Sequence, residues 1–289
     1  MTPVPRTARH RADPDAAVPP DAAVPPCADC IADCIADCIA DSAGGLTFDV
    51  TETGEPGAAL LVLRRREGHE EVSLPLTPTG DGRLRAALPS GVALPEGRWD
   101  AYAQVAGGEP RRLAPGVNDL RSLVARVPSG SLGHVAVRIP YATRHGNLSV
   151  RSWLRAPHAE AVELYRGERG LGVRGRVYGV PLAPDAYAEV RHRDATGPPI
   201  RAEVAVEQAE FGFTVAYGAL RPGVWDLWLR PAGEDGPRVR IARLLDAIAD
   251  KRPFLIHPRV PVKTLYGPVE AGPYYTRDND LSVTVTAAG

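Results

Sequence analysis

One phrase of eleven residues occurs twice in this chain, and it limits the possible folds more than any other feature. PYATRHGNLSV spans residues 140–150 and PYYTRDNDLSV spans residues 273–283, with seven identities and no gap. An ordered match of this length is not expected by chance. We therefore predict that the chain contains two copies of one structural module.

A second pair of matching phrases lies upstream of the first. GRWDAYAQV begins at Gly97 and GVWDLWLRP begins at Gly223, so that each copy contains the sequence G-x-W-D. The matching tryptophans are 126 residues apart, whereas the PY phrases are 133 residues apart. The second copy therefore carries seven additional residues between its two phrases, and insertions of this kind belong in loops.

Alternation of side-chain type predicts that each copy is built from strands. Small or apolar side chains recur at every second position after each G-x-W-D, as expected for a strand with one buried face. These positions are Trp99, Ala101, Ala103 and Val105 in the first copy, and Trp225, Leu227 and Leu229 in the second. Short strands separated by Gly, Pro and Asp turns are typical of antiparallel sandwiches. The predicted fold class is all-β, with two tandem immunoglobulin-like antiparallel β-sandwiches behind a disordered N-terminal arm.

The length of 289 residues allows two modules of ordinary size, each with its own core. We expect an arm over residues 1–43, a first module over 44–156 and a second over 157–289. One helical spacing stands out, formed by Ile241, Leu244, Leu245 and Ile248. It predicts one or two helical turns in the region of the insertion.

The arm is rich in proline and alanine and ends in a cysteine repeat. DAAVPP occurs twice over residues 15–26, and such proline density favours extended, solvated chain. Cys27, Cys30, Cys34 and Cys38 follow. On a helix, thiols four residues apart would share one face and could hold a soft metal ion or bridge two chains. The spacing fits no usual zinc or cluster site, so a mobile tail is the favoured interpretation.

Four aromatic residues of the repeated phrases are expected to be structural. Trp99 and Trp225 fall on the predicted inward face of their strands. Tyr141 and Tyr274 each follow a proline, which favours extended backbone before the ring. A buried tyrosine ring can place its hydroxyl on a loop carbonyl.

The paired phrases G-x-W-D and P-Y-x-T-x-x-x-x-L-S-V resemble accessory C-terminal modules of actinobacterial proteins. Those modules follow family-2 glycosyltransferases and teichoic-acid-type polyol-phosphate transferases, and stand-alone copies are often labelled "transferase". The resemblance covers roughly residues 44–289. The catalytic part of that family is a nucleotide-diphospho-sugar fold on an α/β sheet, and no strand-helix alternation precedes the repeats here. The resemblance therefore implies the accessory portion alone and transfers no catalytic residue.

The outward positions of the repeated strand are the candidate ligand-binding residues. Asp100 and Tyr102 in the first copy correspond to Asp226 and Trp228 in the second. Sugars are commonly held between an aromatic plane and a carboxylate that accepts hydroxyl protons. The alternative is that each aspartate pairs with an arginine of a neighbouring strand and each aromatic ring packs against the other module.

Charge and motif content exclude several function classes. The formal net charge is -1 with a pI near 6.7, which argues against nucleic acid as a partner. No run of about 18 apolar residues and no apolar signal segment is present, so the default expectation is the cytoplasm, with contact to the inner face of a membrane only through a partner. No cofactor is expected. The G-x-G-x-x-G spacing at 170–175 lies in a predicted strand and is interpreted as a chance match.

The leading hypothesis is a non-catalytic accessory protein that binds a glycan or cell-surface polymer, or that docks or oligomerises a glycosyl- or polyol-phosphate transferase. One alternative is a transferase acting on a cell-wall glycopolymer. Another is a purely structural oligomerising protein. Because no catalytic motif is found, the enzyme hypothesis ranks below the binding hypothesis.

Overall fold

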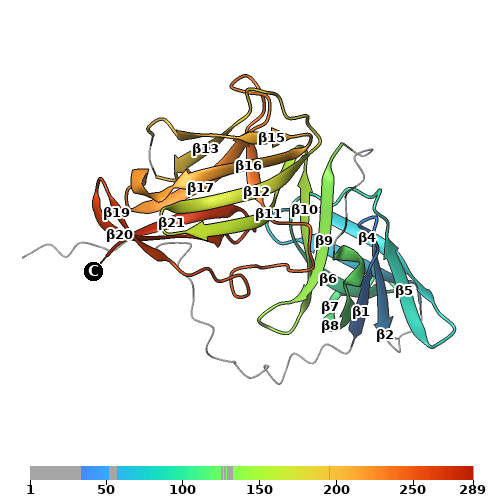
Figure 1. The fold of residues 1–289 in the computed structure, drawn as a ribbon. Helices are drawn as coiled ribbons and strands as arrows, with labels where there is room; N and C mark the ends of the chain where they lie inside the picture. The colour runs from blue at the N-terminus through green and yellow to red at the C-terminus, as the bar shows by residue number, and fades with distance from the viewer. Residues whose placement is uncertain are drawn as a thin grey trace, which may run out of the picture.

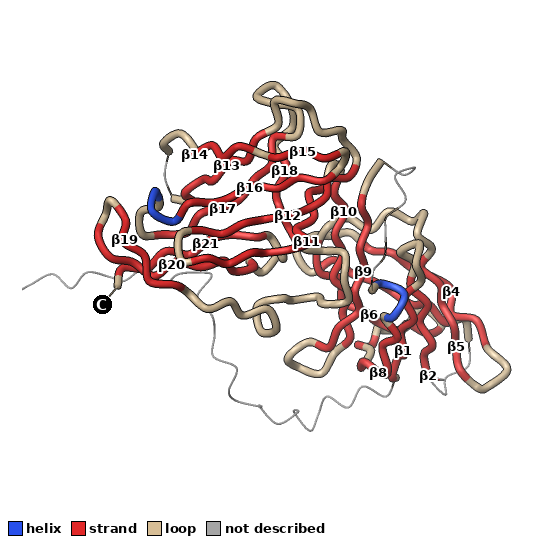
Figure 2. Tube along the Cα trace, viewed as in Figure 1, coloured by secondary structure: helices blue, strands red, loops and turns tan. Residues whose placement is uncertain are grey.

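The computed structural model describes residues 34–51, 57–124, 126, 128, 133–194 and 196–288. Within these ranges the regular structure consists of strands and two short 3-10 turns, η1 (Arg121–Leu123) and η3 (Tyr217–Ala219), as Figure 2 shows. The all-β prediction is confirmed.

The first unit contains ten strands. They are β1 (Ile35–Ala40), β2 (Leu46–Thr51), β3 (Ala59–Arg65), β4 (Glu71–Pro78), β5 (Arg83–Leu88), β6 (Gly97–Val105), β7 (Arg111–Arg112), β8 (Ala114–Asp119), β9 (Val135–Ala142) and β10 (Leu148–Arg155). Their hydrogen-bonded order is β8-β1-β2-β5-β4-β3-β6-β10-β9, with β7 beside β6. The pair β1 and β8 is parallel, and the other pairs are antiparallel.

The second unit contains eleven strands. They are β11 (His158–Gly167), β12 (Gly170–Tyr178), β13 (Tyr187–His192), β14 (Ile200–Glu203), β15 (Ala205–Glu207), β16 (Glu210–Ala216), β17 (Gly223–Arg230), β18 (Val239–Ala242), β19 (Val260–Thr264), β20 (Gly267–Tyr275) and β21 (Leu281–Ala287). Their order is β15-β16-β12-β11-β18-β17-β21-β20-β19, and β13 pairs with β14 and β17. Figure 1 shows the two units side by side, in blue to green and in yellow to red.

Each unit closes around its own buried cluster. In the first, Phe48 of β2 belongs to the same cluster as Trp99 of β6 and Val150 of β10. In the second, Val173 of β12 is clustered with Trp225 of β17. In the second unit the cluster also contains Phe211 of β16 and Val269 of β20, which lie near opposite ends of the sheet order. Strands that are distant in each sheet order thus face one shared core, which is a sandwich arrangement. The immunoglobulin-like connectivity is a finer statement and stays a prediction.

The repeated strand has the face pattern that the sequence predicts. Trp99, Ala101 and Ala103 are buried on β6, and Trp225 and its apolar successors are buried on β17. Each tryptophan donates its indole N–H to a carbonyl four residues earlier, at 3.0 Å in the first copy and 2.9 Å in the second. Burial with a satisfied polar atom makes each ring an anchor, and Trp→Ala in such a site costs roughly 3–5 kcal/mol.

The cysteine repeat corrects the expected boundary of the arm. Residues 35–40 form β1, which pairs with β2 and β8, so the described end of the predicted arm belongs to the first unit. Cys34 and Cys38 are buried. A spacing of four keeps side chains on one face of a strand as well as of a helix, because the strand period is two. Burial raises the pKa of Cys38 to about 12. Cys27 and Cys30 lie outside the described residues.

The helix predicted around Ile241 to Ile248 is wrong. Val239–Ala242 form β18, and residues 243–250 form bends and irregular backbone. The backbone donors of Leu244 and Leu245 bind the carboxylate of Glu160, at 2.8 to 3.1 Å, and are thus taken by a side chain rather than by a helical carbonyl. Leu244 packs into the core of the first unit, so this segment joins the two units.

Candidate functional site

Two neighbouring grooves share Arg277 in their linings. The first groove, of about 910 Å³, is lined mainly by the first unit, with residues 249, 250, 252 and 277 from the second. The second groove, of about 630 Å³, is lined mainly by the second unit, with residues 96, 155 and 156 from the first. Both grooves therefore lie at the junction of the two units.

Six equivalent positions of the two units line the two grooves. Four lie in the repeated phrases. Arg66 and Arg193 are equivalent because they donate to the carbonyls of Arg98 and Val224, and Arg112 and Arg240 because they face Tyr102 and Trp228 on the neighbouring strand. In the first groove they are Arg66, Asp100, Tyr102, Arg112, Thr143 and Arg144. In the second groove they are Arg193, Asp226, Trp228, Arg240, Thr276 and Arg277. All four candidate ligand-binding residues from the sequence are thus placed at a groove, two in each. The two grooves thus have matching sets of lining residues.

Strand register sets this arrangement. Asp100 faces Ser149 across the β6–β10 pair, and Asp226 faces Ser282 across the β17–β21 pair. The serines belong to the L-S-V ending of the repeated phrase. The two repeated phrases are therefore cross-strand neighbours, and this explains why they occur together in each copy.

Asp100 is surrounded by donors. Its carboxylate accepts hydrogen bonds from Arg66, at 2.5 Å, and from the Ser149 hydroxyl, at 2.7 Å, while Arg112 lies 3.2 Å away. Partial burial acts to raise the pKa of Asp100, but the hydrogen bonds and the two arginine charges outweigh it. The pKa lies below its ordinary value.

Asp226 has the equivalent partners. It accepts from Arg193 at 2.9 Å, from Arg240 at 2.7 Å and from the Ser282 hydroxyl at 2.9 Å. Burial again opposes ionisation, and the arginines again lower the pKa of the carboxyl below its ordinary value. Both aspartates thus adopt the alternative considered for the sequence, in which arginines of neighbouring strands hold the carboxylate.

The two aromatic rings lie under guanidinium groups. Arg64 and Arg112 approach the Tyr102 ring at 5.2 and 4.9 Å from its centroid. Arg238 and Arg240 approach the Trp228 ring at 4.5 and 5.0 Å. These distances are those of cation–π contacts. The rings therefore orient arginines at the groove walls, and the chemical character of each site is that of a hydrogen-bond donor.

The turn in each repeated phrase presents a further arginine. Thr143 receives the Asn147 N–H on its hydroxyl, at 3.1 Å, and Thr276 receives the Asp280 N–H in the same way, at 3.2 Å. Each turn contains one residue with positive φ, which Gly146 and Asn279 tolerate. The closed turns leave the side chains of Arg144 and Arg277 exposed at the grooves.

Tyr141 and Tyr274 are half-buried rather than fully buried, and Tyr141 lines the first groove. The fully buried ring of the second copy is its neighbour Tyr275, at the position of Ala142 in the first copy. The expected anchoring role of this tyrosine pair is therefore shared with an adjacent residue in the second copy.

The second turn also joins the two units. Asp278 accepts a hydrogen bond from Arg151 at 2.8 Å, and its backbone carbonyl accepts one from the Trp153 indole at 3.1 Å. Asp280 accepts from Arg155 at 2.7 Å. Residues 278–280 have a D-x-D spacing that sequence reasoning overlooked. Both carboxylates are engaged by arginines, and the described residues contain no group of three or more His, Cys, Asp or Glu side chains that could hold a metal ion.

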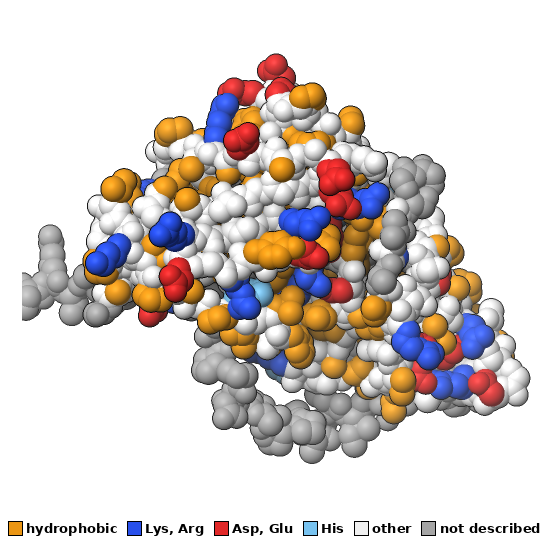
Figure 3. Space-filling view, viewed as in Figure 1, with side chains coloured by type: hydrophobic (Ala, Val, Ile, Leu, Met, Phe, Trp, Pro, Cys, Tyr) orange, Lys and Arg blue, Asp and Glu red, His pale blue; other side chains and the backbone are white. Residues whose placement is uncertain are grey.

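The two grooves differ in charge. The first is lined by seven arginines and two aspartates, and the second by five arginines and four acidic residues. Over β1, β2 and β5, by contrast, Arg83 pairs with Asp37 and Arg85 with Asp49. Figure 3 shows basic and acidic side chains side by side at that end of the molecule. The sequence does not reveal the groove arginines as a group, because they come together only when strands distant in the sequence pair.

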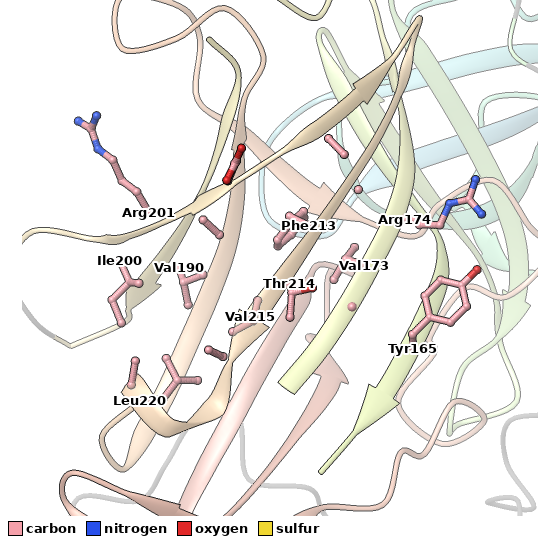
Figure 4. Close-up of a pocket in the computed structure, with 17 residues that line it drawn as sticks. Tyr165, Val173, Arg174, Val190, Ile200, Arg201, Phe213, Thr214, Val215 and Leu220 are labelled. Carbon is pink, nitrogen blue, oxygen red and sulfur yellow. The ribbon is translucent and has the colours of Figure 1, made fainter. Parts of the chain in front are cut away.

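A separate apolar cleft of about 720 Å³ lies in the second unit, away from these residues. Figure 4 shows Val173, Phe213 and Val215 on one side and Val190 and Ile200 on another. It lies between β14 and β16, which do not pair in the described chain, whereas their counterparts β4 and β5 do. None of the candidate residues from the sequence lies here.

No helix in the described part of the chain is long and apolar enough to cross a membrane.

No family model and no curated protein matches this chain. Among solved structures, S. aureus TarS is similar with 14% identity and a TM-score of 0.31, over 62% of this chain and 34% of TarS. The TarS fragment 217–571 is similar with 14% identity and a TM-score of 0.28, over 64% of this chain and 56% of the fragment. A pullulanase from Anoxybacillus sp. LM18-11, complexed with maltotriose, is similar with 11% identity and a TM-score of 0.27, over 68% of this chain and 24% of the pullulanase. The chain thus spans about a third of TarS. All three TM-scores lie below 0.5, and the functional assignment rests on the grooves.

Proposed function

We propose that this protein is a non-catalytic binding module for a glycan or related polyol polymer, which it takes across the two grooves. The observation that carries the proposal is that six equivalent residues of the repeat line each groove. A duplicated fold alone would require the buried positions to match. Here the groove-lining polar positions match as well, down to their hydrogen-bond partners.

The chemistry of the sites suits an oxygen-rich ligand. Arginine side chains supply several N–H donors and no acceptor, so each groove recognises acceptor groups such as hydroxyl, phosphate or carboxylate oxygens. Tyr102 and Trp228 hold these arginines and add apolar area at the walls. The ligand role assigned to Asp100 and Asp226 becomes an orienting one, because each carboxylate fixes two arginines.

Two neighbouring sites favour a polymer over a single sugar. A chain bound in one groove raises the effective concentration of its next units at the other groove. Arg277, which lines both grooves, lies where such a chain would pass between them. We extend the proposal to an accessory role beside a transferase, which the G-x-W-D and P-Y-x-T phrases support through their resemblance to transferase-associated modules.

A glycan array tests this function with the intact chain and its Tyr102→Ala and Trp228→Ala variants. We expect the intact chain to bind a subset of polymers, and each variant to lose about tenfold or more in affinity, because loss of the ring frees its arginines. Tyr187→Ala is the matched control. Arg201 lies over the Tyr187 ring, 4.5 Å from its centroid, and neither residue lines a groove.

An unchanged array profile in both groove variants would count against the proposal. Turnover of a nucleotide-sugar donor that a single groove substitution abolishes would replace it with the transferase hypothesis.

A further inference from the structure

We propose that the first groove is a binding site for a tetrahedral oxyanion, phosphate or sulfate, carried by the polymer, whereas the second groove takes an uncharged part of the chain. This inference deepens the proposed function and rests on it. It starts from the charge difference between the grooves.

The carboxylates at the first groove are too few for its arginines. Arg66 and Arg112 share Asp100, and Arg252 pairs with Asp250 at 2.7 Å. Arg151 and Arg98 reach Asp278, at 2.8 and 3.9 Å, and that carboxylate lines the other groove. Arg98 also lies 3.9 Å from the exposed carboxylate of Glu67. The protein thus supplies fewer negative charges than positive ones at this surface.

Two arginines of the groove lack a carboxylate partner in the described chain. Arg144 donates to the His145 ring at 2.9 Å, and Arg277 contributes its backbone carbonyl to Arg98. Both side chains are exposed, and they are the equivalent arginines of the two repeated turns. Two turns from different units thereby point uncompensated guanidinium groups at one groove.

The floor of the groove adds a buried charge. The Arg151 side chain is 5% exposed, and its Nε atom is buried without a hydrogen-bond partner. Burial lowers the pKa of this guanidinium, because removing its charge from water is costly. An anion in the groove would offset that cost, and oxyanions bind guanidinium groups through paired N–H donors.

The second groove lacks this excess. Asp226, Asp278, Asp280 and Glu96 lie among its five arginines. Arg155, for example, is bound by Glu96 at 2.9 Å and by Asp280 at 2.7 Å. These carboxylates would repel a second oxyanion. The first groove therefore binds the charged groups of the polymer, and the second groove binds its uncharged units.

A polymer of sugar units is favoured over nucleic acid as the source of the oxyanion. The whole chain has a formal net charge of -1, and the second groove has nearly as many acidic residues as arginines. Nucleic acid binding requires an extended basic face along the backbone.

Calorimetric titration with dextran, dextran phosphate and dextran sulfate of one length tests the inference. We expect an esterified dextran to bind at least tenfold more tightly than dextran at low salt, with the advantage shrinking at high salt. Comparison of the two esters identifies the preferred oxyanion. Arg144→Ala with Arg277→Ala should reduce the esters to the affinity of dextran. Arg201→Ala, which removes an exposed arginine outside both grooves, is the control and should change nothing.

Two outcomes separate this inference from the proposed function. Dextran binding with no preference for either ester would overturn the oxyanion site and keep the polymer-binding function. In the other outcome, the protein binds pyrophosphate, the alanine double variant does not, and neither dextran nor its esters bind. This result would overturn the polymer-binding function and keep the oxyanion site. Tighter binding of oligo(dT) than of dextran phosphate would overturn the choice of polymer. Arg144→Lys with Arg277→Lys, which keeps both charges, should retain part of the preference and shows that loss in the alanine variant is not misfolding.

Discussion

Asp100 and Asp226 are each held by two arginines and a serine, on equivalent strands of the two units. Their side chains are 18% and 17% exposed, so part of the hydration of the carboxylate has been replaced by these donors. Removing the charge would leave two neighbouring arginines without the carboxylate that they share. This makes both aspartates contributors to stability as well as to the shape of the grooves.

We predict that Asp100→Asn combined with Asp226→Asn lowers the free energy of unfolding by about 2–5 kcal/mol at pH 7. Because the pKa of each aspartate in the folded protein lies below its ordinary value, the stabilising contribution is fully present above about pH 5 and is lost as the pH falls through the folded-state pKa. Urea unfolding across pH 2 to 7 measures both effects. The free energy of unfolding of the double variant should fall less on acidification than that of the wild type.

Glu71→Gln is the control for this pair, because Glu71 and Arg64 form an ion pair with both side chains more than 40% exposed. Its effect should stay within about 0.5 kcal/mol. Equal acid dependence in the wild type and the double variant would refute the assigned role of the aspartates.

At the scale of elements, β1 links β2 to β8 within the first unit, and the segment after β18 links the second unit to the first. β1 is the parallel partner of β8, as β11 is the parallel partner of β18 in the second unit. The cysteine repeat therefore occupies the position of an integral strand. The Leu244 segment fills the first core from the second unit, with its backbone fixed by Glu160.

A chain that begins at residue 44 should be much less stable than one that begins at residue 34. Loss of β1 uncovers Phe48 and the β8 edge, and removes the buried side chains of Cys34, Ala36, Cys38 and Ala40. Thermal unfolding should show the first unit melting at least 10 °C lower, if it folds at all. Equal melting temperatures would mean that β1 is dispensable.

At the scale of the molecule, the turn of the second repeated phrase fastens one unit to the other. Arg155 from β10 binds both Glu96 of its own unit and Asp280 of the second, and these carboxylates raise the pKa of the guanidinium despite its burial. The grooves exist because the two units are held in this relation. Weakening the junction should therefore affect ligand binding and unfolding together.

Arg155→Ala is predicted to cost about 3–5 kcal/mol, because it leaves two carboxylates at the junction without their shared partner. Calorimetry should then resolve two transitions, one for each unit, where the wild type gives a more cooperative one. Arg121→Ala is the control, since that side chain is 90% exposed. A single unshifted transition in Arg155→Ala would show that the junction does not depend on this residue.

Local patterns in the sequence indicated most of the strands outside β1, the buried face of the repeated strand and the two matching sets of phrases, because a period of two and a repeated phrase are properties of neighbouring residues. They also placed Asp100, Tyr102, Asp226 and Trp228 outside the core. Only the tertiary structure decided what those residues meet. Two of the three partners of Asp100, Arg66 and Ser149, are 34 and 49 residues away, and Arg151 reaches Asp278 across 127 residues. Side-chain binding by Glu160 likewise replaced the predicted helix with a bent segment. Such contacts depend on how distant strands pair, and no single stretch of sequence contains that information.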